Sequence, residues 1–222
     1  MPRKGRYATT NEPFRPPLQA RSRESHRRIL EAAGELLDRQ SFEAVTVAEI
    51  ARRSKSSVGA FYARFEDKDA LLEQLDGLCA EELAAAGRGD VVGLGAGAAD
   101  LEERIEAAVG FYVGLYRRRA GVIRALRVRE RGRMRTRFGE RMKESERALL
   151  VAPVLAARRR VDHPDPQLAS TLGALMVTRA LEERILFPEM TESPTPITDA
   201  AFTKELARAY LAYLGVSASA AG

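Results

Sequence analysis

The fold is decided by residues 46–65, TVAEIARRSKSSVGAFYARF. Thr46 and Glu49 have the spacing of a capping box, which predicts that a helix begins here. The inner face of this helix carries three apolar residues, Val47, Ile50 and Ala51. A second short helix is expected between Ser57 and Phe65, after a turn of about three to four residues. Two short helices joined in this way form a helix-turn-helix.

Apolar residues continue at helical spacing on both sides of this stretch. A helix is expected over about 22–40, with an inner face of Ile29, Ala33, Leu36 and Leu37. The acidic residues of Glu66-Asp67-Lys68-Asp69 suit the positive end of a helix dipole and open a further helix. Later helices are expected at about 101–116, over 120–160 in two pieces broken around Gly132, at about 166–187 and at 198–214. No segment alternates with a period of two residues, so the predicted fold class is all-α.

Basic residues are concentrated at the start of the chain. Residues 1–65 hold 13 Lys and Arg against 7 Asp and Glu, which gives this part a net charge of +6, whereas the whole chain carries +5. A basic head on a nearly neutral body favours a polyanionic partner but does not identify it.

Three segments in register resemble a known family: residues 46–51, residues 57–65 and residues 67–72, DKDALL. Together they resemble the N-terminal module of the tetracycline-repressor (TetR) family over about 50 residues. Beyond residue 75 the resemblance extends only to helix number and chain length. It implies a sequence-specific DNA-binding transcription regulator that binds a palindromic operator as a homodimer. The usual outcome in the family is a repressor released by a small-molecule effector, and activation stays open as an alternative.

The resemblance and the helix pattern divide the chain into three parts. Residues 1–21 are expected to be a flexible basic arm, because charged residues and prolines cannot pack together. Residues 22–68 would be the N-terminal three-helix helix-turn-helix DNA-binding domain. Residues 69–222 would be a C-terminal helical domain for effector (ligand) binding and dimerisation.

The resemblance places four phosphate contacts, at Thr46, Ser57, Tyr62 and Lys68. The residue chemistry adds further DNA-binding candidates in the same stretch, Lys55, Ser56, Val58, Gly59, Ala60 and Arg64. Small side chains would let the second helix lie deep in a major groove, where Val58 or Ala60 could contact thymine methyl groups. The competing interpretations are a frayed helix start at Gly59, a half-buried packing role for Tyr62 and a solvated surface charge at Lys68.

The turn departs from the family pattern. Relatives usually carry a glycine followed by an apolar residue there, whereas this chain has Lys55-Ser56. A left-handed Lys55 would store about 1–3 kcal/mol of strain and would offer one more phosphate contact.

The C-terminal domain contains bulky or adaptable side chains able to line an effector pocket. The candidates are Phe111, Tyr112, Tyr116, Met134, Phe138, Met142 and Met176. Ordinary core packing is the alternative for each of them. An effector is expected to shift the helix that follows Arg119, and with it the fourth helix and the spacing of the two recognition helices.

Two amphipathic helices, about 166–187 and 198–214, are expected to pair with their symmetry mates as a four-helix bundle. The alternative is that both are core helices of a monomer. Residues 117–143 form a strongly basic run, with 12 basic against 2 acidic residues. Three interpretations of this run stay open. It is a solvated face paired with acidic residues elsewhere, a site for an anionic effector such as an acyl thioester of coenzyme A, or an additional DNA-facing surface.

Other classes of function find little support. His26 and His163 have no cysteine partner and no metal-ligand spacing, and no nucleophile elbow or carboxylate pair stands out. We therefore expect no enzyme activity, no metal and no cofactor. No apolar run is long enough to span a membrane, so a cytoplasmic, nucleoid-bound protein is expected. A helical adaptor that binds protein and no DNA stays as the rival, and salt-dependent DNA affinity would separate the two.

Overall fold

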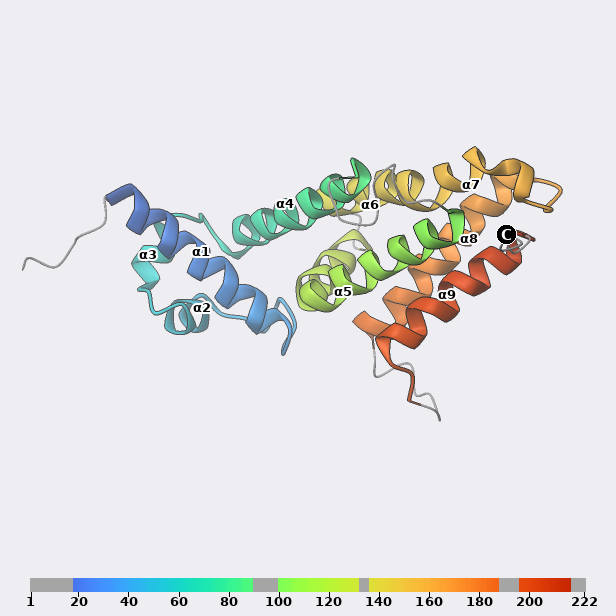
Figure 1. Cartoon of the computed structure of the whole chain (residues 1–222). Helices are drawn as coiled ribbons and strands as arrows, with labels where there is room; N and C mark the ends of the chain where they lie inside the picture. Colours follow the sequence, from blue (N-terminus) through green and yellow to red (C-terminus); the bar gives the residue numbers. More distant parts are fainter. Residues whose placement is uncertain (1–17, 90–99, 132–135, 188–195, 217–222) are drawn as a thin grey trace, which may run out of the picture.

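The computed structural model describes residues 18–89, 100–131, 136–187 and 196–216 (Figure 1). Most of these residues form α-helices: α1 Leu18–Leu37, α2 Val47–Arg53, α3 Val58–Tyr62, α4 Lys68–Gly87, α5 Leu101–Arg131, α6 Arg137–Glu146, α7 Ala152–Ala156, α8 Pro166–Leu181 and α9 Asp199–Tyr213. Single π-helical segments continue α6, at Arg147–Val151, and α8, at Glu182–Leu186, and a 3-10 turn spans Arg158–Arg160. Within this part of the chain, β pairing is limited to one isolated bridge between Val161 and Val216. The all-α prediction is confirmed.

The first helix begins earlier than expected. α1 starts at Leu18, so residues 18–21 of the expected flexible arm belong to a helix, and residues 1–17 lie outside the described residues. The sequence just before it is Pro16-Pro17, and proline is compatible with the start of a helix but not with its interior. In contrast, α3 is shorter than expected, because it ends at Tyr62 and the chain then turns to bring Phe65 into the core.

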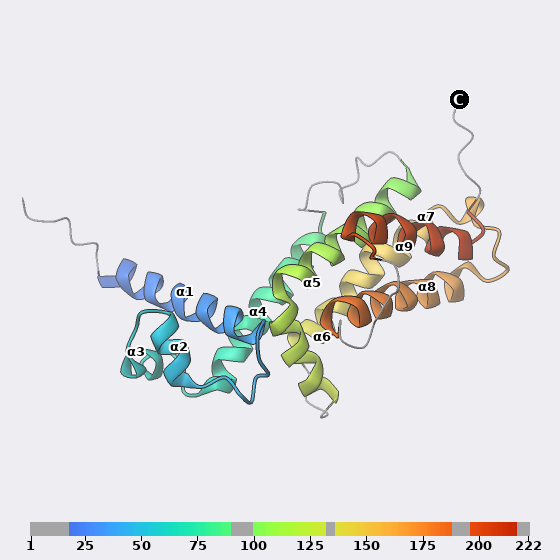
Figure 2. The same ribbon diagram turned by 90° about the horizontal axis from the view of Figure 1, so that it is seen from below.

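The helices form a small module and a larger body. α1, α2 and α3 lie at one end of the molecule, and α8 and α9 lie side by side at the other (Figures 1 and 2). α4 runs from the module into the body, where it packs closely on α6. One continuous apolar core extends through both parts. Apolar contacts therefore connect the module with the body.

α5 is broken near its middle. Arg119 has φ −125° and ψ 20°, outside helical values, so residues 101–118 and residues 120–131 form two helical halves that meet at a kink. The second half passes next to the C-terminal end of α1 (Figure 2). The sequence predicted separate helices on the two sides of this point.

In the described ranges, no helix combines the length and the apolar composition needed to cross a lipid bilayer.

Candidate nucleic-acid interface

α2 begins with the expected capping box. The backbone N–H of Glu49 donates to Thr46 Oγ1 at 3.2 Å, and Glu49 Oε2 accepts from the Thr46 backbone N–H at 2.9 Å. The Thr46 hydroxyl also donates to Glu49 Oε2 at 2.8 Å. Ile50 and Ala51 are buried on the inner face. Thr46 is exposed, but its hydroxyl proton must leave Glu49 before it can reach a phosphate.

The turn after α2 places Lys55 in the left-handed conformation. Lys55 has φ 53°, and it stands at the position after the helix end that usually holds glycine. The N–H of Ser56 donates to the carbonyl of Ala51 at 2.9 Å, and the N–H of Lys55 donates to the carbonyl of Arg52 at 3.3 Å. This pair of hydrogen bonds is a Schellman motif. The Ser56 hydroxyl lies 2.7 Å from that of buried Ser54, so it belongs partly to the turn.

α3 turns one face to the core and one face to solvent. Ser57 caps it by accepting the N–H of Ala60 at 3.0 Å, and Phe61 and Phe65 are buried with ring centroids 5.2 Å apart. On the other face, Val58 is 44% exposed and Tyr62 is 56% exposed.

Gly59 is exposed beside Val58 and Tyr62, and Ala60 is half-buried. A Cβ on Gly59 would meet only Ser57 Oγ, at 3.8 Å, so no contact within the described protein requires glycine there. The exposed face is small except for one valine and one phenol.

Lys68 is held inside the module. Its ammonium group donates to the carbonyls of Val45 at 2.6 Å, Phe42 at 3.0 Å and Glu43 at 3.3 Å. It also lies 4.9 Å from the centre of the Phe42 ring. An ammonium group has three donors, and all three are used here. A phosphate contact by Lys68 would have to replace one of these bonds.

Arg64 is also turned partly inward. Its Nη1 donates to the carbonyl of Ala60 at 2.7 Å, at the end of α3. Its Nε is buried without an acceptor in the part of the chain that the structure describes. His26 of α1 stacks on Phe65 with a centroid distance of 5.2 Å, which joins α1 to the segment that follows α3. Lys55, Ser57 and Tyr62 are left as the more freely exposed candidates.

The expected effector-pocket residues separate into three groups. Tyr112, Tyr116, Phe138 and Met142 are buried between the helices of the body, and Phe111 is half-buried. Met134 lies outside the described residues. Met176 is 44% exposed on the outer face of α8, so the expectation that it lines an interior pocket is wrong.

α8 carries two apolar faces. Its buried face begins with small residues, Ala169, Ser170, Gly173 and Ala174, and continues with Val177, Thr178 and Leu181. A Cβ on Gly173 would lie 2.1 Å from Cε2 of Tyr210, so the ring of α9 packs directly on the α8 backbone. Four large apolar residues lie exposed on the outer face, Leu168, Leu172, Leu175 and Met176. Sequence periodicity alone could not tell which of the two faces is buried.

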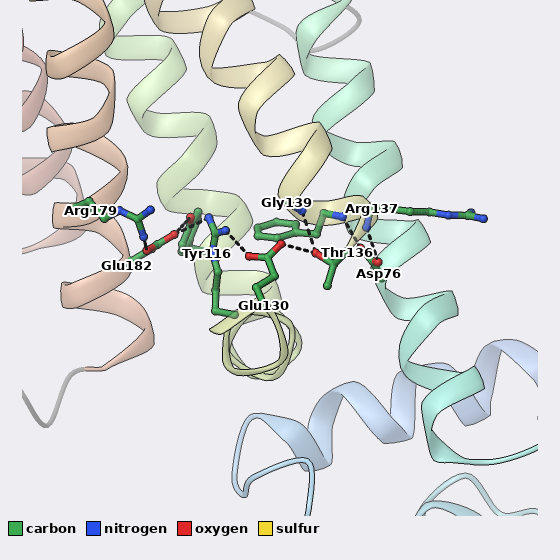
Figure 3. Close-up of polar contacts among 10 residues, drawn as sticks. Asp76, Tyr116, Glu130, Thr136, Arg137, Gly139, Arg179 and Glu182 are labelled. Carbon is green, nitrogen blue, oxygen red and sulfur yellow. Dashed lines mark hydrogen bonds and ion pairs between the residues drawn. The ribbon is translucent and has the colours of Figure 1, made fainter. Parts of the chain in front are cut away.

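A chain of polar contacts crosses the body from α8 to α4 (Figure 3). Arg127 of α5 contacts Glu182 at 2.5 Å and Glu130 at 2.8 Å, and the Tyr116 hydroxyl donates to Glu182 at 3.3 Å. Thr136, which caps α6, donates to Glu130 at 2.5 Å. Tyr116, which was expected to line an apolar pocket, thus borders an ion cluster, whereas the hydroxyl of Tyr112 lies 2.9 Å from that of Ser145. Burial raises the pKa of Tyr116 above its usual range.

Asp76 completes this chain on α4. It is buried, and its carboxylate accepts the backbone N–H groups of Arg137 at 2.8 Å and Phe138 at 2.5 Å (Figure 3). Burial is the main cause that raises its pKa, and the two backbone hydrogen bonds act against it. The sequence analysis missed Asp76, although a signal was present. It is a single acid on a stripe that otherwise contains Leu72, Cys79 and Leu83.

The basic run is largely paired within the protein. Arg117 contacts Asp199, Arg118 and Arg119 contact Glu82, Arg127 contacts Glu130 and Glu182, and Arg129 contacts Asp69. Arg124 donates to the carbonyl of Leu186 at 2.7 Å. Of the three interpretations of this run, these contacts support the paired face.

A groove of about 1170 Å³ opens between α1, α4 and the second half of α5. None of the effector-pocket candidates within the described residues lines it. Its walls include both apolar residues, such as Leu30 and Val122, and charged residues, such as Glu73 and Arg118.

Comparison with known proteins links the module to a family. Residues 29–75 match the family model described as bacterial regulatory proteins, tetR family. No curated protein matches the chain.

Similar solved structures cover nearly the whole described fold. A bacterial regulatory protein in the tetR family from Rhodococcus RHA1 is 20% identical, with a TM-score of 0.67 over 87% of this chain and 98% of that chain. The fatty acid degradation regulator FadR from Bacillus halodurans is 18% identical, with a TM-score of 0.63 over 84% of this chain and 94% of that one. The ketosteroid transcriptional regulator KstR2 of Mycobacterium tuberculosis is 16% identical, with a TM-score of 0.63 over 87% and 95%. The fold is shared with these proteins.

Proposed function

Residues 29–75 form a domain of the tetR family of bacterial regulatory proteins, and on this premise we propose that the chain is a ligand-responsive repressor. A domain of this family is that of a DNA-binding transcription regulator. The chain binds a palindromic operator as a homodimer, and a small-molecule effector releases it.

The exposed face of α3 is the observation that carries the proposal. Val58 and Tyr62 are about half exposed, while Phe61 between them is buried. An exposed apolar and aromatic face on a short helix of small residues suits insertion into a major groove. Val58 and Ala60 would contact thymine methyl groups, and Gly59 would allow the backbone to approach the bases closely.

The phosphate contacts come from the rim of this face. The Ser57 hydroxyl accepts the N–H of Ala60, which leaves its own proton for a phosphate oxygen. The Tyr62 hydroxyl and the Lys55 ammonium group are exposed on the two sides of α3. Arg64 keeps N–H groups beyond the one that it donates to Ala60, and Thr46 contributes after its hydroxyl turns away from Glu49. In this proposal Lys68 shapes the loop and is not itself a phosphate contact.

The dimer forms through α8 and α9. Leu168, Leu172, Leu175 and Met176 lie on one face of α8, each 42–59% exposed. Four large apolar side chains gathered on one helix face are more than single scattered exposures and favour an interface between proteins. A two-fold axis beside this face would bring two copies of the α8–α9 pair together and would set two α3 helices on one side of a duplex.

The effector acts among α5, α6 and α8. Tyr112, Tyr116, Phe138 and Met142 lie there, and they are buried so closely that a ligand must part the helices to enter. Parting them would move α6, and Asp76 would transmit that movement to α4. Only an effector with different affinity for the two arrangements changes operator binding.

The test is binding of the wild-type protein and two α3 variants to a duplex enriched by the wild-type protein. Tyr62→Ala is expected to weaken binding by about 1–2 kcal/mol, close to tenfold, because it removes both the ring and the hydroxyl. Tyr62→Phe keeps the ring and separates the two contributions. Affinity that falls steeply with salt supports the regulator. Equal affinity of all three proteins for enriched and scrambled duplexes would support the adaptor instead.

A further inference from the structure

The end of α1 is attached directly to the second half of α5. The backbone N–H of Gly121 donates to Oδ1 of Asp38 at 2.9 Å, although the two residues are 83 positions apart in the sequence. Asp38 follows directly after the last residue of α1, and Gly121 comes two residues after the break at Arg119. One partner of this hydrogen bond, Asp38, therefore belongs to the module, and the other, Gly121, belongs to the body, whose α5 passes next to the end of α1 (Figure 2).

Position 121 requires glycine because there is no space for a Cβ at this contact. An added Cβ would lie 2.2 Å from the carbonyl carbon of Leu37, 2.3 Å from its oxygen and 2.4 Å from the Asp38 nitrogen. All three are backbone atoms, so no side chain can move aside. Any larger residue must push the end of α1 away by more than 1 Å to restore ordinary contact distances of about 3.5 Å.

The break in α5 explains why Asp38 is needed. Non-helical angles at Arg119 interrupt the ladder of backbone hydrogen bonds, so N–H groups that follow the break need partners from elsewhere. Gly121 is buried, and a buried N–H without an acceptor is costly. The Asp38 carboxylate supplies that acceptor as a capping residue does, but from another part of the fold.

The other end of the same α5 segment also touches the module. Arg129 forms an ion pair with Asp69, at the start of α4, and its guanidinium group lies 5.5 Å from the centre of the Phe42 ring. Phe42 lies between α1 and α2, where Lys68 also contacts it. Residues 119–131 thus contact the end of α1 through Asp38 at one end, and Phe42 of the module together with Asp69 of α4 at the other.

We propose that Asp38 and Gly121 are positioning residues for DNA binding. They fix the angle between α1 and the second half of α5. A movement of this half of α5 therefore reaches the recognition helix, α3, through α1 as well as through α4. The inference rests on the proposed DNA-binding function and assigns the residues that set the separation of the two recognition helices in the dimer.

α1 carries this angle to the DNA-binding surface. His26 stacks on Phe65, just beyond α3, and it lies about 16 Å along the helix from the contact at Leu37. A tilt of α1 about its C-terminal end therefore displaces α3 sideways. Two displaced recognition helices no longer match half-sites one helical turn apart.

The experiment compares variants of the joint on an operator enriched by the wild-type protein and on copies of it with the half-sites moved apart or together by one and two base pairs. Asp38→Ala is expected to weaken binding about fivefold and to flatten the dependence on spacing, because one hydrogen bond is lost. Asp38→Asn keeps the acceptor oxygen and should restore the wild-type pattern. Gly121→Ala should shift the preferred spacing, since the end of α1 must retreat.

Matched controls are available in the same module. A Cβ on Gly34, in α1, meets nothing within 4 Å, so Gly34→Ala changes the same residue type without a collision. Glu43→Ala removes an exposed acid from the loop that follows α1. Both controls should bind within about twofold of the wild type at every spacing, because their substitutions leave the joint intact.

Hydrogen–deuterium exchange of the peptide that contains Gly121 tests the joint without DNA. The peptide should exchange faster in Asp38→Ala and at the wild-type rate in Asp38→Asn. A folded Asp38→Ala protein with wild-type exchange and a wild-type spacing profile would overturn the proposal. If the wild-type protein enriches no operator, the DNA-binding function itself fails, and faster exchange in Asp38→Ala would then show the joint to be structural only.

Discussion

Asp76 of α4 accepts the backbone N–H of Phe138 in α6 at 2.5 Å, across 62 positions of sequence. Its second oxygen accepts the N–H of Arg137 at 2.8 Å, so one carboxylate serves two N–H groups of the first turn of α6. α4 leads to the recognition module and α6 borders the interior of the body. This side chain is therefore a direct mechanical link between the two.

Removal of that carboxylate should loosen α6. Asp76→Ala leaves two N–H groups of a helix start without acceptors and is expected to lower the free energy of unfolding by about 1–3 kcal/mol. Asp76→Asn keeps one acceptor oxygen and should lose less. Glu73→Ala, an exposed acid one turn earlier on α4, is the control, and urea unfolding gives the comparison. Equal stability of the Asp76 and Glu73 variants would contradict the link.

Glu146 should make stability depend on pH. Burial is the main cause that raises its pKa, and Glu182 adds to it, whereas the hydrogen bond with Thr178 and the charges of Arg127 and Arg179 act against it. Because the folded pKa lies above the unfolded value of about 4.3, the stability from this group is present below that pH and is lost as pH rises through the folded pKa.

Glu146→Gln keeps the side chain neutral at every pH. The variant should melt close to the wild-type temperature near pH 4 and above it near pH 7, as thermal unfolding across this range would show. Glu144→Gln, on the exposed side of the same helix, should leave the pH profile unchanged. If the melting temperature of Glu146→Gln depends on pH as strongly as that of the wild type, groups other than Glu146 control this dependence.

Lys68 should act through the stability of the module. Lys68→Met removes three contacts from an ammonium group to carbonyl oxygens, two of them part-buried, and is expected to cost about 2 kcal/mol of unfolding free energy. Because its donors are all engaged in the protein, the slope of DNA affinity against salt should stay at the wild-type value. A slope reduced by about one unit would instead assign Lys68 a phosphate contact.

Lys55 should show the opposite pattern. Lys55→Gly places glycine at φ 53° and is expected to raise the free energy of unfolding by about 1 kcal/mol, since the left-handed conformation is strained for lysine. The same change should weaken DNA binding and reduce the salt slope by about one unit if the ammonium group meets a phosphate. A more stable variant with an unchanged salt slope would confine Lys55 to the turn.

The outer face of α8 should control assembly. Leu172→Glu places a charge at the centre of four exposed apolar residues and should shift the protein from dimer to monomer in sedimentation experiments. Val128→Glu makes the same change at a similarly exposed position on α5 and should leave the dimer intact. Dissociation by both variants, or by neither, would argue against α8 as the interface.

The sequence predicted what depends on neighbouring residues. The capping box of Thr46 and Glu49 depends on residues three positions apart, and it lies as predicted. Local spacing also accounts for the burial of Phe61 and Phe65 and for the turn at Lys55. The all-α class followed from the same local periodicity. These features fix the helix-turn-helix before any long-range contact is known.

Long-range contacts were out of reach of the sequence. The partners of Lys68 are 23–26 positions away, and Asp38 and Gly121 are 83 positions apart, so they become neighbours only when helices dock. Met176 was an effector-pocket candidate because a bulky, adaptable side chain is able to line an apolar cavity. Tyr210 instead packs on Gly173, which turns the small face of α8 inward and Met176 outward.

The most direct test of the central claim is the enrichment of bound duplexes from a random pool by the purified protein at about 150 mM salt, a concentration at which non-specific phosphate attraction is weak. The account predicts a near-palindromic site whose half-sites are centred about one helical turn apart, recovered by the wild-type protein and enriched more weakly by Tyr62→Ala. A pool that stays random over successive rounds, with no retention above a scrambled competitor, would contradict it.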